Sequence, residues 1–391
     1  MEAAFADRIT DVPRSFIREI LKVTLDRSVI SFAGGLPNRD LFPIAELKAA
    51  AMRVFDEEGA DALQYGPSEG HAPLRDYISR RYRERLGLEI PPERILITSG
   101  SQQGLDLLAK TFLNEGDDIL IEEPGYLGAI QAFSVYRARF VPVPLTESGM
   151  DIERLTGAMA SSRPKLAYMV PNFQNPSGIS YSAENRRAVA EAIGGTRTII
   201  IEDDPYGELR FDGTPAPSFG ALAPENTILL GSFSKTVVPG FRLGWIAAPP
   251  AVMDRLLVAK QASDLHTNSF SQRVLARYLL DADPDAHIAR IIAVYREQRD
   301  AMLRAIDGHF PGSVRRTRPQ GGMFLWATLP EGASSLALFE KAAARKVVFV
   351  PGTPFYIGRD DAPTMRLNFS SVDAATIAEG IRRLGDAMRE G

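Results

Sequence analysis

The chain has 391 residues, 45% of them hydrophobic and 24% charged, which is the composition of a globular protein with enough length for two domains. Its formal net charge of -4 predicts no large basic surface and argues against nucleic acid as the main partner. The absence of cysteine excludes disulfides, thiolate nucleophiles and zinc sites with thiolate ligands.

The sequence predicts neither membrane contact nor a metal site. No segment approaches the roughly 20 apolar residues of a membrane span, and the first residues show no signal-peptide pattern, so we expect a cytoplasmic protein that makes no membrane contact. The four histidines include no pair at a metal-ligand spacing, so we expect no metal site.

The chain divides into three parts by pattern. Residues 1–43 contain a short helical pattern, SFIREILKVTL, and then ISFAGGLPNRDLFP. We expect them to form an arm that packs on the small domain and on the functional site. Residues 44–288 are expected to form a large domain, and residues 289–391 a small C-terminal domain.

Helical and strand-like segments alternate through the predicted large domain. AELKAAAMRVFDEEG predicts a helix that ends at Gly59, RILITSG a strand, and QQGLDLLAKTFLNEG a helix that ends at Gly116. The later strand-like runs are short, β-branched and apolar almost throughout, and helical stretches such as SAENRRAVAEAIGG separate several of them. This pattern is typical of a mostly parallel sheet covered by helices on both faces, a three-layer α/β architecture.

The pattern changes after about residue 289. A long helical run, HIARIIAVYREQRDAMLRAID, precedes the strand-like GGMFLWATLP, a helix at SLALFEKAAARK, and strands at VVFVPG and TMRLNFS. In the last helical segment Ile377, Ile381, Leu384 and Met388 share one face. These features predict a smaller α+β domain.

Polar residues follow the predicted strands of the large domain. Ligands of open parallel sheets bind beyond the carboxyl ends of the strands, so these residues are expected to converge on one edge. They are the turn Ser99–Gly104, then Tyr126, Asn175, Asp203, Tyr206, Ser232, Ser234 and Lys235.

Lys235 lies in GSFSKTVVPGFRLGW, between two apolar strand-like runs, where a lysine is costly to bury unless it is paired or used chemically. A phosphate-binding lysine would need Gly-x-x-x-x-Gly-Lys-Ser/Thr, which is absent. An acyl-transfer pair with Ser232 would need downstream partner motifs for which the chain offers only poor substitutes, and it stays the rival interpretation. A Schiff-base lysine needs an acid, an aromatic face, an anion-binding turn and two arginines, all of which the chain supplies.

The ordered set of motifs resembles fold-type I pyridoxal 5′-phosphate (PLP) enzymes, in particular class I/II aminotransferases of the branch that contains α-aminoadipate and kynurenine aminotransferases. The resemblance covers nearly the whole chain and implies the three-layer αβα PLP-dependent transferase fold. It is carried by ISFAGGLPN, YGPSEGHAPLRDYI, ITSGSQQGLDLL, EEPGY, PNFQNPSG, EDDPYGELRF, SFSKTVVPGFRLGW, QASDLHTNSFSQ, PGTPFY and MRLNFS.

The resemblance implies roles for residues around the cofactor ring. Lys235 is expected to form the Schiff base with PLP, and Asp203 to keep the pyridine nitrogen protonated. Tyr206 and Asn175 are expected to hydrogen-bond the phenolic oxygen of the ring, and Tyr126 to stack on its face.

The resemblance also implies a phosphate cup, formed by the backbone amides of Ser101 and Gln102 together with Ser232, Ser234 and Arg242. Tyr65 is expected to reach the phosphate of a neighbouring subunit, which implies a homodimer with shared active sites.

On the substrate side, Arg366 is expected to bind the α-carboxylate, with Asn175 and Gly35 beside it. Arg18 matches an arginine that some relatives use for a distal carboxylate, although an arginine on a solvated helix face is an equal alternative.

Together these features predict a PLP-dependent aminotransferase. It would move the amino group of an L-amino acid (2-aminoadipate, glutamate, aromatic or branched-chain type) to a 2-oxo acid such as 2-oxoglutarate by a ping-pong mechanism. Because one fold supports several reactions, a PLP-dependent lyase and a non-catalytic, PLP-bound amino-acid sensor are the alternatives.

Overall fold

The computed structural model describes residues 4–10, 12, 26 and 28–390. Arg18 and the whole helical pattern predicted at 15–25 lie outside the described residues. Within them, no helix is long and apolar enough to cross a membrane. A short helix, α1 (Asp7–Thr10), stands near the start of the chain.

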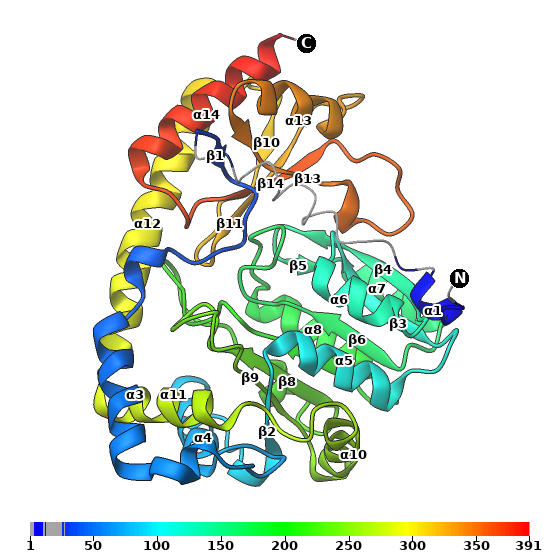
Figure 1. The fold of residues 1–391 in the computed structure, drawn as a ribbon. Helices are drawn as coiled ribbons and strands as arrows, with labels where there is room; N and C mark the ends of the chain where they lie inside the picture. Colours follow the sequence, from blue (N-terminus) through cyan, green and yellow to red (C-terminus); the bar gives the residue numbers. More distant parts are fainter. Residues whose placement is uncertain (1–3, 11, 13–25, 27, 391) are drawn as a thin grey trace.

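An eight-stranded sheet forms the centre of the large domain (Figure 1). Most neighbouring strands are parallel, but β9 is antiparallel to both of its neighbours and β5 to its one neighbour. The described strands are buried almost throughout except for β4, as expected for a sheet covered on both faces. In spatial order they are β2 (Ile95–Thr98), β9 (Gly244–Ala247), β8 (Thr227–Ser232), β7 (Ile199–Asp203), β6 (Leu166–Met169), β3 (Asp118–Glu123), β4 (Arg139–Thr146) and β5 (Gly149–Met150).

Helices cover the two faces of this sheet because alternate strand residues point to opposite sides. Ile119 and Ile121 pack with α5 (Ser101–Phe112), α6 (Leu127–Ser134) and α10 (Pro250–Gln261), whereas Leu120 packs with α7 (Ile152–Ser161), α8 (Ala183–Ile193) and α9 (Phe219–Leu222). At the β2 end, a separate core joins α3 (Ile44–Glu58), α4 (Ala72–Leu86) and α11 (Ser269–Asp281).

The small domain is built on α12 (Pro284–His309), which runs from the large domain along the side of the molecule (Figure 1). The proposed domain boundary at 288/289 falls inside this helix. An antiparallel sheet in the order β10 (Arg315–Arg316), β11 (Phe324–Thr328), β14 (Thr364–Asn368) and β13 (Val350–Pro351) packs with α12, α13 (Ser335–Ala344) and α14 (Ala374–Arg389). The predicted apolar face of α14 is buried at Ile377, Ile381 and Leu384.

The described end of the N-terminal segment lies against the small domain. Its strand β1 (Ile30–Ser31) pairs in parallel with β12 (Val347–Val348), and Phe32 accepts a hydrogen bond from the amide of Asn368. This pairing carries the next residues, which include Gly35, towards the carboxyl edge of the large sheet.

Arg186 of α8 is buried and fastens this helix to the carboxyl edge of the sheet. Its guanidinium donates to the carbonyl of Pro171 at 3.0 Å and to Oδ1 of Asn172 at 2.6 Å, and it lies 3.5 Å from Oε1 of Glu202, at the end of β7. Because Glu202 is equally buried, each charge depends on the other.

We predict that Arg186→Met lowers the free energy of unfolding by about 3–5 kcal/mol, because Glu202 loses the positive charge beside it. Urea denaturation measures the change. The matched control is Arg187→Met, one residue along, where the side chain is 61% exposed and lies 3.9 Å from Glu184. We expect the control to change the free energy by less than about 0.5 kcal/mol, and equal effects of the two substitutions would contradict the prediction.

Candidate active site

A cavity of about 400 Å³ lies where the carboxyl ends of β6, β7 and β8 meet the small domain. A larger cavity, of about 650 Å³ beside α4, contains neither Lys235 nor Arg366, so the chemistry belongs to the smaller one. Of the predicted site residues, the following line the smaller cavity: Gly35, Ser101, Gln102, Tyr126, Asn175, Asp203, Tyr206, Ser232, Ser234, Lys235, Arg242 and Arg366.

Two predicted residues are not placed there. Tyr65 is 80% exposed and lies with its ring edge-on to that of His266, with the ring centres 5.7 Å apart. Arg18 lies outside the described residues.

Lys235 follows β8, and its Nζ donates a hydrogen bond of 2.8 Å to the carbonyl of Gly35 from the N-terminal segment. Burial lowers the pKa of Lys235 to about 8, and the positive charges of Arg366 and Arg242 act in the same direction. A substantial fraction of this amine is therefore neutral at mildly alkaline pH, the form that attacks a carbonyl carbon.

Asp203 is the last residue of β7, and its two carboxylate oxygens differ in their surroundings. The hydroxyl of Tyr168 donates to Oδ2 at 2.7 Å, whereas Oδ1 is buried and has no hydrogen-bond partner among the described residues. Burial raises the pKa of Asp203 to about 7; the Tyr168 hydrogen bond opposes this shift and the charge of Asp204 adds to it. An N–H donor opposite Oδ1 would satisfy this oxygen and favour its charged form.

Arg366 reaches the cavity from β14, a strand of the small domain. Its Nη1 donates to Oδ1 of Asn175 at 2.9 Å and its Nη2 to the carbonyl of Ala33 at 2.7 Å, while Nε is buried without a partner among the described residues. Its guanidinium lies over the ring of Phe324, 4.4 Å from the ring centre. A buried guanidinium with unused donor capacity is suited to bind a carboxylate.

The turn before α5 has the features of an anion site. Gly100 has φ +78°, and a Cβ there would lie 2.6 Å from Nη2 of Arg242, so the guanidinium packs directly on the turn. The first amides of α5, at Ser101 and Gln102, have no intrahelical partners because they begin the helix. The hydroxyl of Ser232, which accepts from the amide of Ser234 at 3.1 Å, lines the same cavity.

These groups fit PLP point by point. An amine with a lowered pKa suits the aldehyde, an unpartnered carboxylate oxygen suits a protonated ring nitrogen, and helix amides beside Arg242 suit the phosphate. The three-layer fold and this site define a fold-type I PLP enzyme.

Comparison with known proteins gives the family. A family model described as "aminotransferase class I and II" matches residues 27–384. The chain is 42% identical to aromatic-amino-acid aminotransferase 1 of Thermococcus litoralis, over 100% of this chain and 95% of that protein. It is 43% identical to 2-aminoadipate transaminase of Thermus thermophilus, over 99% of this chain and 96% of that protein.

A solved structure agrees with these relatives. The crystal structure of Pyrococcus horikoshii kynurenine aminotransferase in complex with PMP, kynurenine and product matches with a TM-score of 0.94 and 40% identity, over 99% of this chain and 97% of that one. The chain therefore belongs to the class I and II aminotransferases, and its cofactor is pyridoxal 5′-phosphate. The predicted family branch, fold class, enzyme class and cofactor are confirmed.

Sequence reasoning missed Tyr168 and Glu122. Glu122 of β3 is buried and accepts hydrogen bonds from the Tyr181 hydroxyl at 2.7 Å, the Val170 amide at 2.9 Å and Nε2 of Gln174 at 3.0 Å. It thereby holds the loop that carries Asn175. The signal for both residues was a polar group within an apolar strand run.

We predict that Glu122 makes the cofactor-free protein less stable as the pH rises. Burial raises the pKa of this carboxyl from its ordinary 4.5 to about 7 in the folded chain. Between these values the folded state binds more protons than the unfolded state, so stability falls as the pH increases. Replacing Glu122 with glutamine should reduce this loss between pH 5 and pH 7 by about 2 kcal/mol.

Urea denaturation of the cofactor-free protein at several pH values measures the slope. The matched control is Glu123→Gln at the next position, where the carboxylate is paired with Arg359 at 2.6 Å. A pH slope that Glu122→Gln and Glu123→Gln alter equally would show that Glu122 is not the group that titrates.

Proposed function

We propose that the protein transfers the amino group of an L-amino acid to a 2-oxo acid such as 2-oxoglutarate by a ping-pong mechanism. The observation that carries the proposal is the placement of Lys235 and Arg366 in one cavity, one from each domain. A carboxylate held by Arg366 brings its α-carbon into the cavity that contains the reactive amine.

The proposed mechanism assigns each step to a side chain of this chain. Bound PLP supplies an electron sink for the negative charge that develops at the substrate Cα. Arg366 binds the substrate carboxylate and fixes the direction of the Cα–H bond. The Nζ of Lys235 would take the proton from Cα as general base and then pass it to the cofactor as general acid. Oδ1 of Asp203 would accept the hydrogen bond of the protonated ring nitrogen.

The remaining predicted contacts complete the proposal. Tyr206, whose side chain hydrogen-bonds Asn175, and Asn175 itself would bind the phenolic oxygen of the ring, and Tyr126 would stack on its face. The first amides of α5 would bind the phosphate together with Arg242 and the two serines of the cup, Ser232 and Ser234.

The residues that line the cavity indicate which substrate side chains it can accept. Leu36, Leu127 and Phe355 line it and form an apolar surface that suits aromatic or branched-chain substrates. The names of the relatives add 2-aminoadipate and kynurenine to the candidates. Arg18 is the predicted ligand for a distal carboxylate, as in glutamate or 2-aminoadipate, and this role stays a prediction.

We also propose a cytoplasmic homodimer with shared sites. The support is Tyr65, a tyrosine 80% exposed on the surface of one chain, which family resemblance assigns to the phosphate of the partner. Tyrosine is enriched in protein–protein interfaces, so an exposed tyrosine suits this role.

The first test offers a panel of amino acids to the PLP-loaded protein and follows loss of the visible absorption of lysine-bound cofactor, before and after 2-oxoglutarate is added. We expect aromatic or dicarboxylic amino acids to bleach the band and 2-oxoglutarate to restore it. Lys235→Ala should lower turnover at least about a thousandfold, because the proton-transfer group is lost. Lys48→Ala, an exposed lysine of α3, is the control.

The other outcomes identify the alternatives. Release of ammonia with an oxo acid, without need for an acceptor, would indicate a lyase. Binding of amino acids without bleaching would indicate a sensor.

The second test concerns the shared site. Lys235→Ala and Tyr65→Phe chains are mixed, allowed to exchange subunits and assayed at limiting PLP. A mixed dimer would contain one site with both native residues, so the activity of the mixture should exceed the average of the two separate variants. An activity equal to the average of the separate variants would contradict shared sites.

A further inference from the structure

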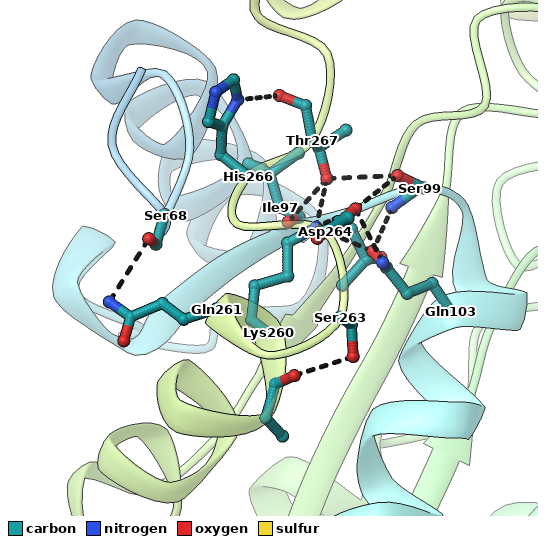
Figure 2. A network of polar contacts seen from close by, with 12 residues as sticks. Ser68, Ile97, Ser99, Gln103, Lys260, Gln261, Ser263, Asp264, His266 and Thr267 are labelled. Carbon is teal, nitrogen blue, oxygen red and sulfur yellow. Dashed lines mark hydrogen bonds and ion pairs between the residues drawn. The ribbon is translucent and has the colours of Figure 1, made fainter. Parts of the chain in front are cut away.

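Lys260, in the last turn of α10, is a fully buried lysine that the proposed mechanism does not use. Figure 2 shows its side chain directed into a cluster of polar groups. Its Nζ donates to Oε1 of Gln103 at 2.8 Å, to Oγ1 of Thr267 at 2.7 Å and to the carboxylate of Asp264 at 2.7 Å. An ammonium group has three N–H donors, so this buried charge is fully partnered.

The same cluster holds the turn of the proposed phosphate cup. Gln103 directly follows Ser101 and Gln102 in α5, and its Oε1 also accepts from the amide of Ser99 at 2.8 Å. Its Nε2 donates to Oδ2 of Asp264 at 2.8 Å, and the hydroxyl of Ser99 donates to the same oxygen at 3.2 Å. The residues on both sides of Gly100 are therefore tied to the Lys260–Asp264 pair.

The cluster is anchored to rigid elements on its other side. Oγ1 of Thr267 donates to the carbonyl of Ile97 in β2 at 3.2 Å, so the end of α10, the sheet and the turn form one connected unit (Figure 2). Lys260 and Asp264 carry opposite charges and together add no net charge near the turn. The pair therefore affects the binding of an anion by positioning the turn, and not by its charge.

We propose that Lys260 is a positioning residue for the cofactor phosphate: it holds the Ser99–Gln103 turn so that the first amides of α5 and the guanidinium of Arg242 converge on one anion. The inference rests on the proposed function, which puts the phosphate in this turn. A lysine that only stabilised the fold would alter the stability of the protein without a selective effect on phosphate binding.

The experiment compares two ligands of the cofactor-free protein, PLP and pyridoxal, which has the same ring and aldehyde without the phosphate. Dissociation constants for both are measured from the absorption of the lysine-bound form. For Lys260→Met we expect PLP to bind at least about tenfold more weakly and pyridoxal to bind as in the native protein. The ratio of the two dissociation constants is the readout. A general loss of stability would weaken the binding of both ligands and leave this ratio unchanged.

Two variants calibrate the result. Lys110→Met is the matched control, because Lys110 of α5 donates to Oγ of Ser263 at 2.7 Å, near the same cluster, without contact to the turn. Its ratio should equal the native one. Arg242→Met removes a proposed direct ligand and should also weaken PLP selectively.

The outcomes separate this inference from the proposed function. A changed ratio for Arg242→Met with an unchanged ratio for Lys260→Met would overturn the role of Lys260 alone. Unchanged ratios for both would overturn the phosphate site itself. If Lys260→Met does not fold, Thr267→Val tests the proposal instead, because it removes one hydrogen-bond partner of Nζ and keeps the shape of the side chain. We expect a several-fold selective loss of PLP binding. A native ratio would overturn the proposal.

Discussion

The burial of charged groups at the carboxyl edge of the large sheet is the constraint on which this site depends. A charge removed from water is costly unless other groups satisfy it, and this edge contains two kinds of buried charge. Arg186 and Lys260 have well-formed sets of partners and fasten helices and loops to the sheet. Asp203 and Arg366 each keep one buried atom that has no hydrogen-bond partner in the described part of the chain, and both side chains line the cavity. The fully partnered charges hold the backbone in place, and this fixed backbone allows the partly unpartnered charges of Asp203 and Arg366 to stay buried.

The cavity also depends on three separate stretches of chain. Lys235 comes from the large domain and Arg366 from the small one, while Gly35 belongs to the N-terminal segment that pairs with β12. The hydrogen bond between Lys235 and Gly35 therefore joins the reactive amine to a segment that is itself attached to the small domain. A change in the position of that domain alters the surroundings of the amine as well as those of the substrate arginine.

Much of this arrangement could be predicted because local signals agreed with the fold. Continuous apolar runs marked the buried strands, and polar residues after each run marked the edge where the cavity lies. Other features depend on tertiary contacts. An apolar run does not reveal strand direction, so the antiparallel placement of β9 was not predicted. The helix expected to reach Gly116 ends at Phe112. Lys260 resembles any polar residue of a surface helix until its contacts with Gln103 and Thr267 are seen.

The continuity of α12 across the proposed domain boundary has a mechanical consequence. Its 26 residues form one hydrogen-bonded rod, with its first turns beside the large domain and its later turns under the small one. At 1.5 Å per residue, the part beyond residue 288 is about 32 Å long. A bend of about 5° near that point would sweep the far end through an arc of about 3 Å. The small domain packs on this outer part of α12, so a slight change in the curvature of the helix would displace the small domain relative to the large sheet.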